Sequence, residues 1–197
     1  TQLTMRTFHF GGATGAADIT QGVPRAEELL EVRNPKNESI LSPLSGTVKK
    51  IERSARHYKI LIHGAKGRRE LITTPSSLSI LVKEGDKILK GQQLNEGYKD
   101  PKKIYAYQGR MPAFKYILTE LKKAYNFQGA EVHDKHIETI IKKIFSRVKV
   151  KEVGDSDFVQ YEIVEKDIFL QKNRELRAQK KKPAKGVLMI LGITRTA

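Results

Sequence analysis

The first ten residues place four chemically different side chains on one helical face. If residues 1–10 form a helix, an i, i+3, i+4, i+7 spacing joins Gln2, Met5, Arg6 and His9. This face offers an amide, a soft thioether, a permanent cation and a titratable imidazole. Such a set can contact a base or sugar, a flat apolar ring and a phosphate chain together. The alternative interpretation, which spacing alone favours, is an amphipathic face in contact with solvent.

A loop and a second helix must position that face. Residues 11–17 contain three glycines and no large apolar side chain, so little burial offsets the entropy of ordering them and we expect a mobile tip. The second helix carries Pro24 in its first turn, where proline is tolerated, and we expect Pro35 to stop it. Its apolar residues can pack against the first helix, and they are Leu29, Leu30 and Val32. The sequence therefore predicts a helical hairpin over residues 1–36.

These residues carry a family resemblance. The segments TQLTMRTFHFGG and DITQGVPRAEELLEVRNPK closely resemble the trigger loop of the largest, beta-prime subunit of bacterial DNA-directed RNA polymerase. The resemblance returns at His133–Glu138, Gly154–Asp157 and Leu191–Thr194, so it spans essentially the whole chain, from the trigger loop through the jaw. Phe10 departs from the family, which more often has a smaller residue there.

The resemblance implies a role for each residue of the first face. The trigger loop of the family folds into two helices over a matched nucleoside triphosphate, hinged here at Gly11 and Gly12. Substrate contacts then come from Gln2 at the ribose, Met5 at the base, and Arg6 and His9 at the phosphates. Arg6 and His9 are the implied catalytic residues. His9 either protonates the departing pyrophosphate or serves as a positional and electrostatic contact, and both roles stay open.

The resemblance also implies an enzyme whose metal lies elsewhere. Nucleotidyl transfer uses Mg²⁺, which the family holds with an Asn-Ala-Asp-Phe-Asp-Gly-Asp cluster that is absent from these 197 residues. We therefore expect this segment to bind no cofactor and to be inactive alone, with Mg²⁺ held by residues outside it. The implied partners are the beta, alpha, omega and sigma subunits, the DNA template, nascent RNA and nucleoside triphosphates. The implied location is the bacterial cytoplasm, at the nucleoid.

The charge balance points independently to a polyanionic partner. The chain has 37 lysines and arginines, 22 acidic residues and a formal net charge of +15, which favours nucleic acid through counterion release. It has no cysteine, which excludes disulfides and thiolate metal sites, and no apolar run long enough to span a membrane. Because it begins at Thr1 rather than Met, we expect a segment of a longer polypeptide.

Residues 37–100 read as short strands separated by glycine-containing turns, among them Ser79–Val82. The segments SPLSGTV and VKEGDKILKGQ resemble the barrel-sandwich hybrid fold of biotinyl and lipoyl carriers, and beta-prime subunits contain such a domain, the jaw, beside downstream DNA. A carrier function would need an exposed hairpin lysine, and Lys99 is a poor candidate. Basic residues that could follow a phosphate backbone are Lys49, Lys50, Arg53, Arg68 and Arg69. A solvated surface is the alternative for each of them.

Residues 101–150 predict a pair of amphipathic helices, over residues 112–126 and 134–148. We expect Gly129 to end the first helix and Asp134 to cap the second. His133 and His136 lie three residues apart without a third ligand in register, so we expect them to be structural and predict no metal site.

The remaining residues, 151–197, predict strands that return to the β domain, a charged helix over residues 165–180, a buried strand over residues 187–193 and the start of a switch region. The expected fold class is therefore α+β, a helical hairpin followed by a small barrel-sandwich hybrid with an inserted helix pair. Two other functions are open, a stand-alone basic nucleic-acid-binding protein and, with less support, a biotinyl or lipoyl carrier.

Overall fold

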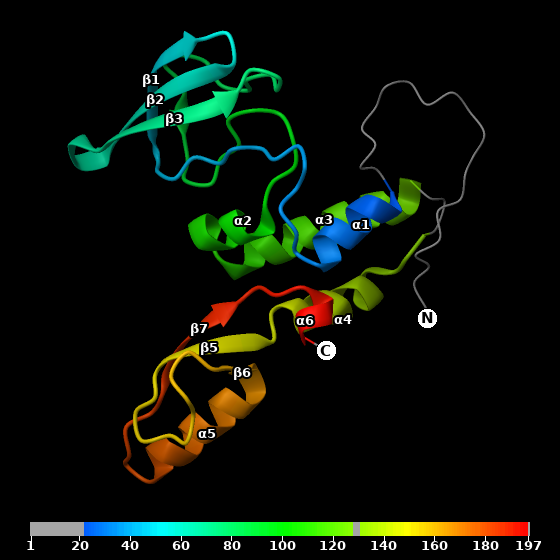
Figure 1. Ribbon diagram of the computed structural model, residues 1–197, viewed down its shortest axis with the longest axis vertical. Coiled ribbons are helices and arrows are strands. Elements are labelled where there is room, and N and C mark those ends of the chain that lie inside the picture. Colours follow the sequence, from blue (N-terminus) through cyan, green and yellow to red (C-terminus); the bar gives the residue numbers. More distant parts are fainter. Residues whose placement is uncertain (1–21, 128–130, 197) are drawn as a thin grey trace. The chain divides into compact units, whose positions relative to one another are not determined.

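The computed structural model describes residues 22–127 and 131–196, and the chain forms two compact units. One unit is Asn34–Tyr116, and the other combines the described residues on either side of it. The described residues contain six α-helices and two antiparallel sheets, so the predicted mixed α+β class is confirmed (Figure 1).

The elements of the first unit in sequence are β1 (Gly46–Arg53), β2 (His57–Gly64), the 3₁₀ turn η1 (Ala65–Gly67), β3 (Arg69–Pro75), β4 (Lys87–Ile88) and α2 (Pro101–Gln108). The other unit contains α1 (Val23–Leu30), α4 (Asp134–Ile144), β5 (Arg147–Glu152), β6 (Ile163–Glu165), α5 (Lys166–Ala178), β7 (Lys185–Met189) and α6 (Ile193–Thr196). The long helix α3 (Arg110–Phe127) contributes residues to both.

The four-stranded sheet has the order β3-β2-β1-β4, with antiparallel pairing throughout, and Figure 1 shows β1, β2 and β3 side by side. Val48 lies opposite Ile62, and Ile60 opposite Ile72, so alternate residues of each strand bury one face. The buried core of this face is Val48, Ile60, Ile62, Ile72, Val82, Ile88 and Leu94. Ser79–Val82 does not form the predicted strand, because its ladder is limited to an isolated bridge between Ile80 and Asn95.

Helix α2 was not predicted from the sequence, which placed the first helix of the pair over residues 112–126. Asp100 caps it by accepting a hydrogen bond from the backbone N–H of Lys102 at 2.9 Å, and Pro101 occupies the first turn. The helix ends at Gly109, whose φ of 93° lies in a region that side-chain-bearing residues rarely adopt. The helical region of the chain therefore begins about ten residues earlier than the apolar periodicity indicated.

The two predicted amphipathic helices are confirmed as α3 and α4, with different boundaries at one of them. His133, not Asp134, is the N-cap of α4, and its Nδ1 accepts a hydrogen bond from the Lys135 N–H at 3.3 Å. Asp134 instead lies in the first turn, where its charge favours the positive helix end. The helix ends at Ile144, so Val148 is buried from strand β5 rather than from a helix. Gly129 lies outside the described residues.

The last strands do not rejoin the first sheet. They form a separate antiparallel sheet of order β6-β5-β7, in which β5 pairs with both β6 and β7. Helix α5 covers one face of this sheet and confirms the predicted charged helix (Figure 1). Strand β7 overlaps the predicted buried strand over residues 187–193, but it ends at Met189 and Val187 is 50% exposed, so the predicted end and the predicted burial are wrong.

Helix α5 packs closely on the sheet because Gly186 has no side chain. A Cβ at Gly186 would lie 2.5 Å from a methyl of Val148 and 3.1 Å from the Phe169 ring. The same helix holds the approach to β7, since the Asn173 side chain donates to the Ala184 carbonyl at 2.9 Å and accepts from the Ala184 N–H at 2.8 Å. The Phe169 ring and the Asn173 side-chain amide, both on α5, therefore hold β7 in register with β5.

Candidate functional site

All six residues predicted for substrate contact and hinge motion lie outside the described residues, and they are Gln2, Met5, Arg6, His9, Gly11 and Gly12. The described part of the predicted hairpin is its second limb, α1 and the residues that follow it. The structure therefore shows how this limb is anchored.

Helix α1 begins as predicted, with Pro24 in its first turn, but ends earlier than expected. The Arg33 N–H donates to the Glu28 carbonyl at 2.9 Å and the Val32 N–H to the Leu29 carbonyl at 3.2 Å, the pattern of a Schellman motif. Val32 has a φ of 49°, where glycine is usual, yet its side chain is only 2% exposed. Burial of this side chain therefore holds the turn, and Pro35 lies beyond the helix end.

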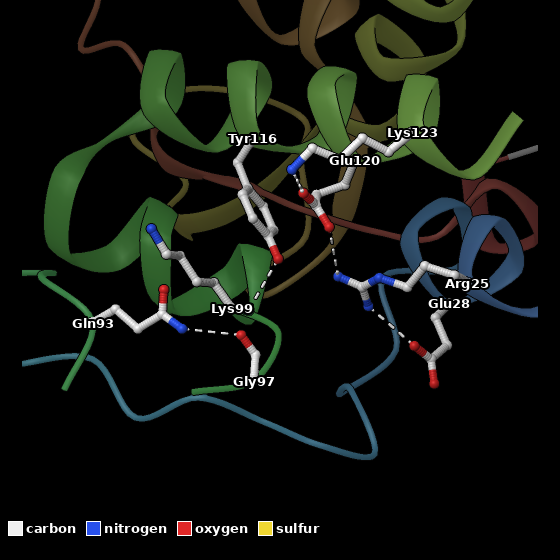
Figure 2. A network of polar contacts seen from close by, with 8 residues as sticks. All are labelled: Arg25, Glu28, Gln93, Gly97, Lys99, Tyr116, Glu120 and Lys123. Atoms are coloured by element: carbon white, nitrogen blue, oxygen red, sulfur yellow. Dashed lines mark hydrogen bonds and ion pairs between the residues drawn. The ribbon is translucent and has the colours of Figure 1, made fainter. Parts of the chain in front are cut away.

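A buried arginine ties α1 to α3 (Figure 2). The Arg25 side chain is 4% exposed and its guanidinium lies 3.0 Å from the Glu28 carboxylate and 3.9 Å from that of Glu120. Glu120 also pairs with Lys123 at 2.9 Å, on the same helix. Because a buried charge is costly without partners, this network fixes the position of α1 on α3.

A second contact ties the end of α1 to the Leu191–Thr194 segment. The Thr194 hydroxyl donates to the Glu31 carboxylate at 2.6 Å. Gly192 lies against the same residue, and a Cβ there would lie 2.5 Å from the Glu31 carbonyl oxygen. Two segments that carry the family resemblance, far apart in sequence, therefore meet in one unit. Sequence reasoning missed this pairing and that of Arg25 with Glu120, since neither long-range pair has a local periodic signal.

The basic residues predicted to contact DNA are all exposed but do not form one cluster, and they are Lys49, Lys50, Arg53, Arg68 and Arg69. By register, Lys50 and Arg69 lie on the sheet face opposite the core, whereas Arg53 lies on the core side with its guanidinium 5.7 Å from the Tyr58 ring centroid. Lys50 also pairs with Glu52 at 2.7 Å, and this hydrogen bond raises the pKa of Lys50. These observations give a dispersed basic surface.

The described residues also bear on the carrier alternative. Lys99 is half-buried immediately before α2, and its backbone N–H donates to the Tyr116 hydroxyl at 2.9 Å (Figure 2). Nearby, the Gln93 amide donates to the Gly97 carbonyl at 3.0 Å. Lys99 thus stands immediately before a helix rather than at the tip of a β-hairpin.

Within residues 22–127 and 131–196, no group of three or more His, Cys, Asp or Glu side chains could hold a metal ion. The same ranges include no helix long and apolar enough to cross a membrane.

Comparison with known proteins defines the class to which the chain belongs. The family model for RNA polymerase Rpb1, domain 5, matches residues 1–197, and the chain is a member of that family. Among curated proteins, it is similar to the DNA-directed RNA polymerase subunit beta' of Lactobacillus johnsonii (40% identity over 200 residues), Finegoldia magna (39% over 197) and Bacillus subtilis (39% over 198). Each alignment covers 100% of this chain and 16% of the relative, so the chain spans about a sixth of their length.

Proposed function

We propose that this chain is the part of a bacterial RNA polymerase beta-prime subunit that runs from the trigger loop through the jaw. The observation that carries the proposal is similarity to beta-prime subunits at about 40% identity along the entire chain. Residues 1–36 are then the trigger helices and loop, residues 37–100 the barrel-sandwich hybrid of the jaw, and residues 101–150 the helical insertion. The parent enzyme acts in the cytoplasm, at the nucleoid, with its other subunits, DNA and RNA.

The proposed work of this segment is closure over the incoming nucleotide. Closure needs one limb that moves and one that is held, and the anchoring of α1 by Arg25 and Glu31 supports the second limb as the fixed one. On closing, Met5 covers the base and Gln2 reaches the ribose. A matched nucleotide stabilises the closed state, and this difference in stability is the source of selection.

The phosphate contacts come from Arg6 and His9. The guanidinium can hold two phosphate oxygens in a fixed geometry. The imidazole either donates a proton to the leaving pyrophosphate oxygen or, as a cation, balances the charge that develops there. We propose that Mg²⁺ is held by residues of the parent subunit outside this segment, because the aspartate cluster with which the family binds the metal does not occur in these 197 residues.

Replacement of His9 in the full-length subunit of the assembled polymerase tests the proposal. For His9→Ala, we expect the maximal rate of single-nucleotide addition to fall more than the apparent affinity for the nucleotide, because the contact strengthens in the transition state. The matched control is His57→Ala, which removes an exposed histidine from β2 and should leave both parameters unchanged. An effect confined to affinity, or an equal effect in both variants, contradicts the proposed role.

The proposal includes contact of the jaw with downstream DNA. The support is the net charge of +15 and the shared outer face of Lys50 and Arg69. Contacts to phosphates should contribute to affinity without sequence preference, and the Lys50 contact should be the weaker because Glu52 partly neutralises that lysine. A stand-alone nucleic-acid-binding protein would share this surface, and it would bind DNA in the absence of other polymerase subunits.

A further inference from the structure

The β6-β5-β7 sheet has one covered and one open face. Val148 and Val150 of β5 point to the covered face, where they form a buried cluster with Phe169 of α5. The alternate residue Lys149 lies opposite Ile163 on one side and Val187 on the other. Because cross-strand partners share a face, these three residues form a row on the side away from α5.

This open face carries large apolar side chains in contact with solvent. Ile163 is 47% exposed, Val187 is 50% exposed and Tyr161 is 56% exposed. The Lys149 ammonium lies 5.3 Å from the Tyr161 ring centroid and the Lys151 ammonium 5.7 Å from it. We call these five residues, Lys149, Lys151, Tyr161, Ile163 and Val187, the open face.

The backbone at Tyr161 is held in an unusual conformation that presents the ring. Its φ is 69°, in the left-handed region that residues with a large side chain rarely adopt. The Tyr161 N–H donates to the Val150 carbonyl at 2.9 Å, and the Val150 N–H donates to the Glu162 carbonyl at 2.9 Å, so the sheet itself imposes this turn. In this conformation the Tyr161 ring lies within reach of the Lys149 and Lys151 ammonium groups.

The charge of the open face is not neutralised by the chain around it. At the rim, Lys185 pairs with Glu152 at 2.8 Å and Arg147 with Glu165 at 3.5 Å. Neither Lys149 nor Lys151 makes an ion pair with any carboxylate in the described part of the chain. A partner that covers the row would therefore leave two ammonium groups buried unless it brought carboxylates of its own.

We propose that the open face docks an acidic protein segment, one that sets carboxylates beside an apolar side chain. The apolar side chain would cover Ile163 and Val187, and the carboxylates would meet Lys149 and Lys151. A second copy of this chain would oppose like charges, which disfavours self-association. Nucleic acid would supply anions, but its polar backbone would lie against the aliphatic side chains of Ile163 and Val187. An apolar centre with a charged rim and an exposed tyrosine is typical of protein interfaces.

Site-specific cross-linking in the full-length subunit of the assembled polymerase tests the proposal. Val187 is replaced by p-benzoylphenylalanine, and the cross-linked peptide is sequenced by mass spectrometry. We expect the cross-linked peptide to come from a protein segment that has at least two carboxylates next to an apolar residue. The matched control places the same group at Ile168, which is 54% exposed on α5, and should not capture that segment.

Charge variants in the cross-linking background make the result specific. Lys149→Glu with Lys151→Glu should lower the yield of the acidic cross-link by about tenfold or more. Lys149→Arg with Lys151→Arg keeps both charges and should keep the cross-link, which separates loss of charge from loss of fold. Cross-links to nucleic acid, to a segment without carboxylates, or to no partner overturn the proposal, as does a yield unchanged by charge reversal.

Discussion

Removal of the Arg25 side chain should loosen α1 without unfolding the rest of its unit. The guanidinium is 4% exposed, and the Glu28 and Glu120 side chains around it are 12% and 13% exposed. Arg25→Ala would leave both carboxylates in a poorly solvated place. Lys123 still pairs with Glu120, so Glu28 is the carboxylate that loses its cationic partner in the variant.

The size of the effect follows from burial. Removing one partner of a buried ion pair costs about 3–5 kcal/mol because the other charge stays uncompensated. We expect the cost of Arg25→Ala to lie near the lower end of that range, because Lys123 still pairs with Glu120 and because Arg25 lies 3.9 Å from Glu120. At about 1.4 kcal/mol for each factor of ten, amide exchange in α1 should then accelerate on the order of a hundredfold.

Hydrogen exchange followed by mass spectrometry in the full-length subunit measures this directly. The reporting amides are those of Ala26, Glu31 and Arg33, which donate to backbone carbonyls at 2.9–3.0 Å. The matched control is Arg33→Ala, which breaks an ion pair of the same 3.0 Å length with Glu27 whose side chains are 61% and 48% exposed. Exposed pairs contribute about 0–1 kcal/mol, so exchange should change little. Equal exchange rates in the two variants would refute the assignment of Arg25 as the anchor.

Three further predictions concern single helix ends. Burial raises the pKa of Asp100 above 3.8, so the free energy of unfolding falls as pH rises from that value through the folded-state pKa. Asp100→Asn keeps the capping oxygen, so in thermal unfolding the variant should match the parent near pH 3 and be more stable than the parent at pH 7. A variant less stable than the parent at pH 7 is the contrary result. Val32→Gly loses a buried side chain but relieves left-handed backbone strain of about 1–2 kcal/mol. The Arg33 amide of this variant should therefore exchange no faster than that of Val32→Ala. Faster exchange in Val32→Gly would mean that the positive φ of residue 32 carries no strain. His133→Asn replaces a capping hydrogen bond of 3.3 Å with one from a preferred N-cap residue. Amide exchange should show α4 stabilised by about 0.5–1 kcal/mol. Faster exchange in α4 of the variant would contradict the capping role of residue 133.

Periodicity predicted the elements that bury one face against a neighbour. The confirmed helices α3 and α4 were predicted from such a pattern, whereas α5 was predicted as a charged helix. Helix boundaries were less accurate, because at His133 and Asp134 two adjacent residues can each cap, and only the backbone conformation decides between them.

Long-range pairs were beyond the sequence. Arg25 has a local partner in Glu28, but nothing in the spacing identifies Glu120 as its second partner. The same holds for Thr194 and Glu31, and for the separation of the second sheet from the first, since strand pairing depends on which edges are free. The candidate substrate residues stay predictions, because their support is family resemblance.

The intact mass of the natural protein that contains this sequence, captured from its source cells with the proteins that bind it, tests whether the chain is a segment of a beta-prime subunit. We predict a chain several times larger than 22.3 kDa, accompanied by the other RNA polymerase subunits. A free chain of about 22.3 kDa without those subunits would contradict it.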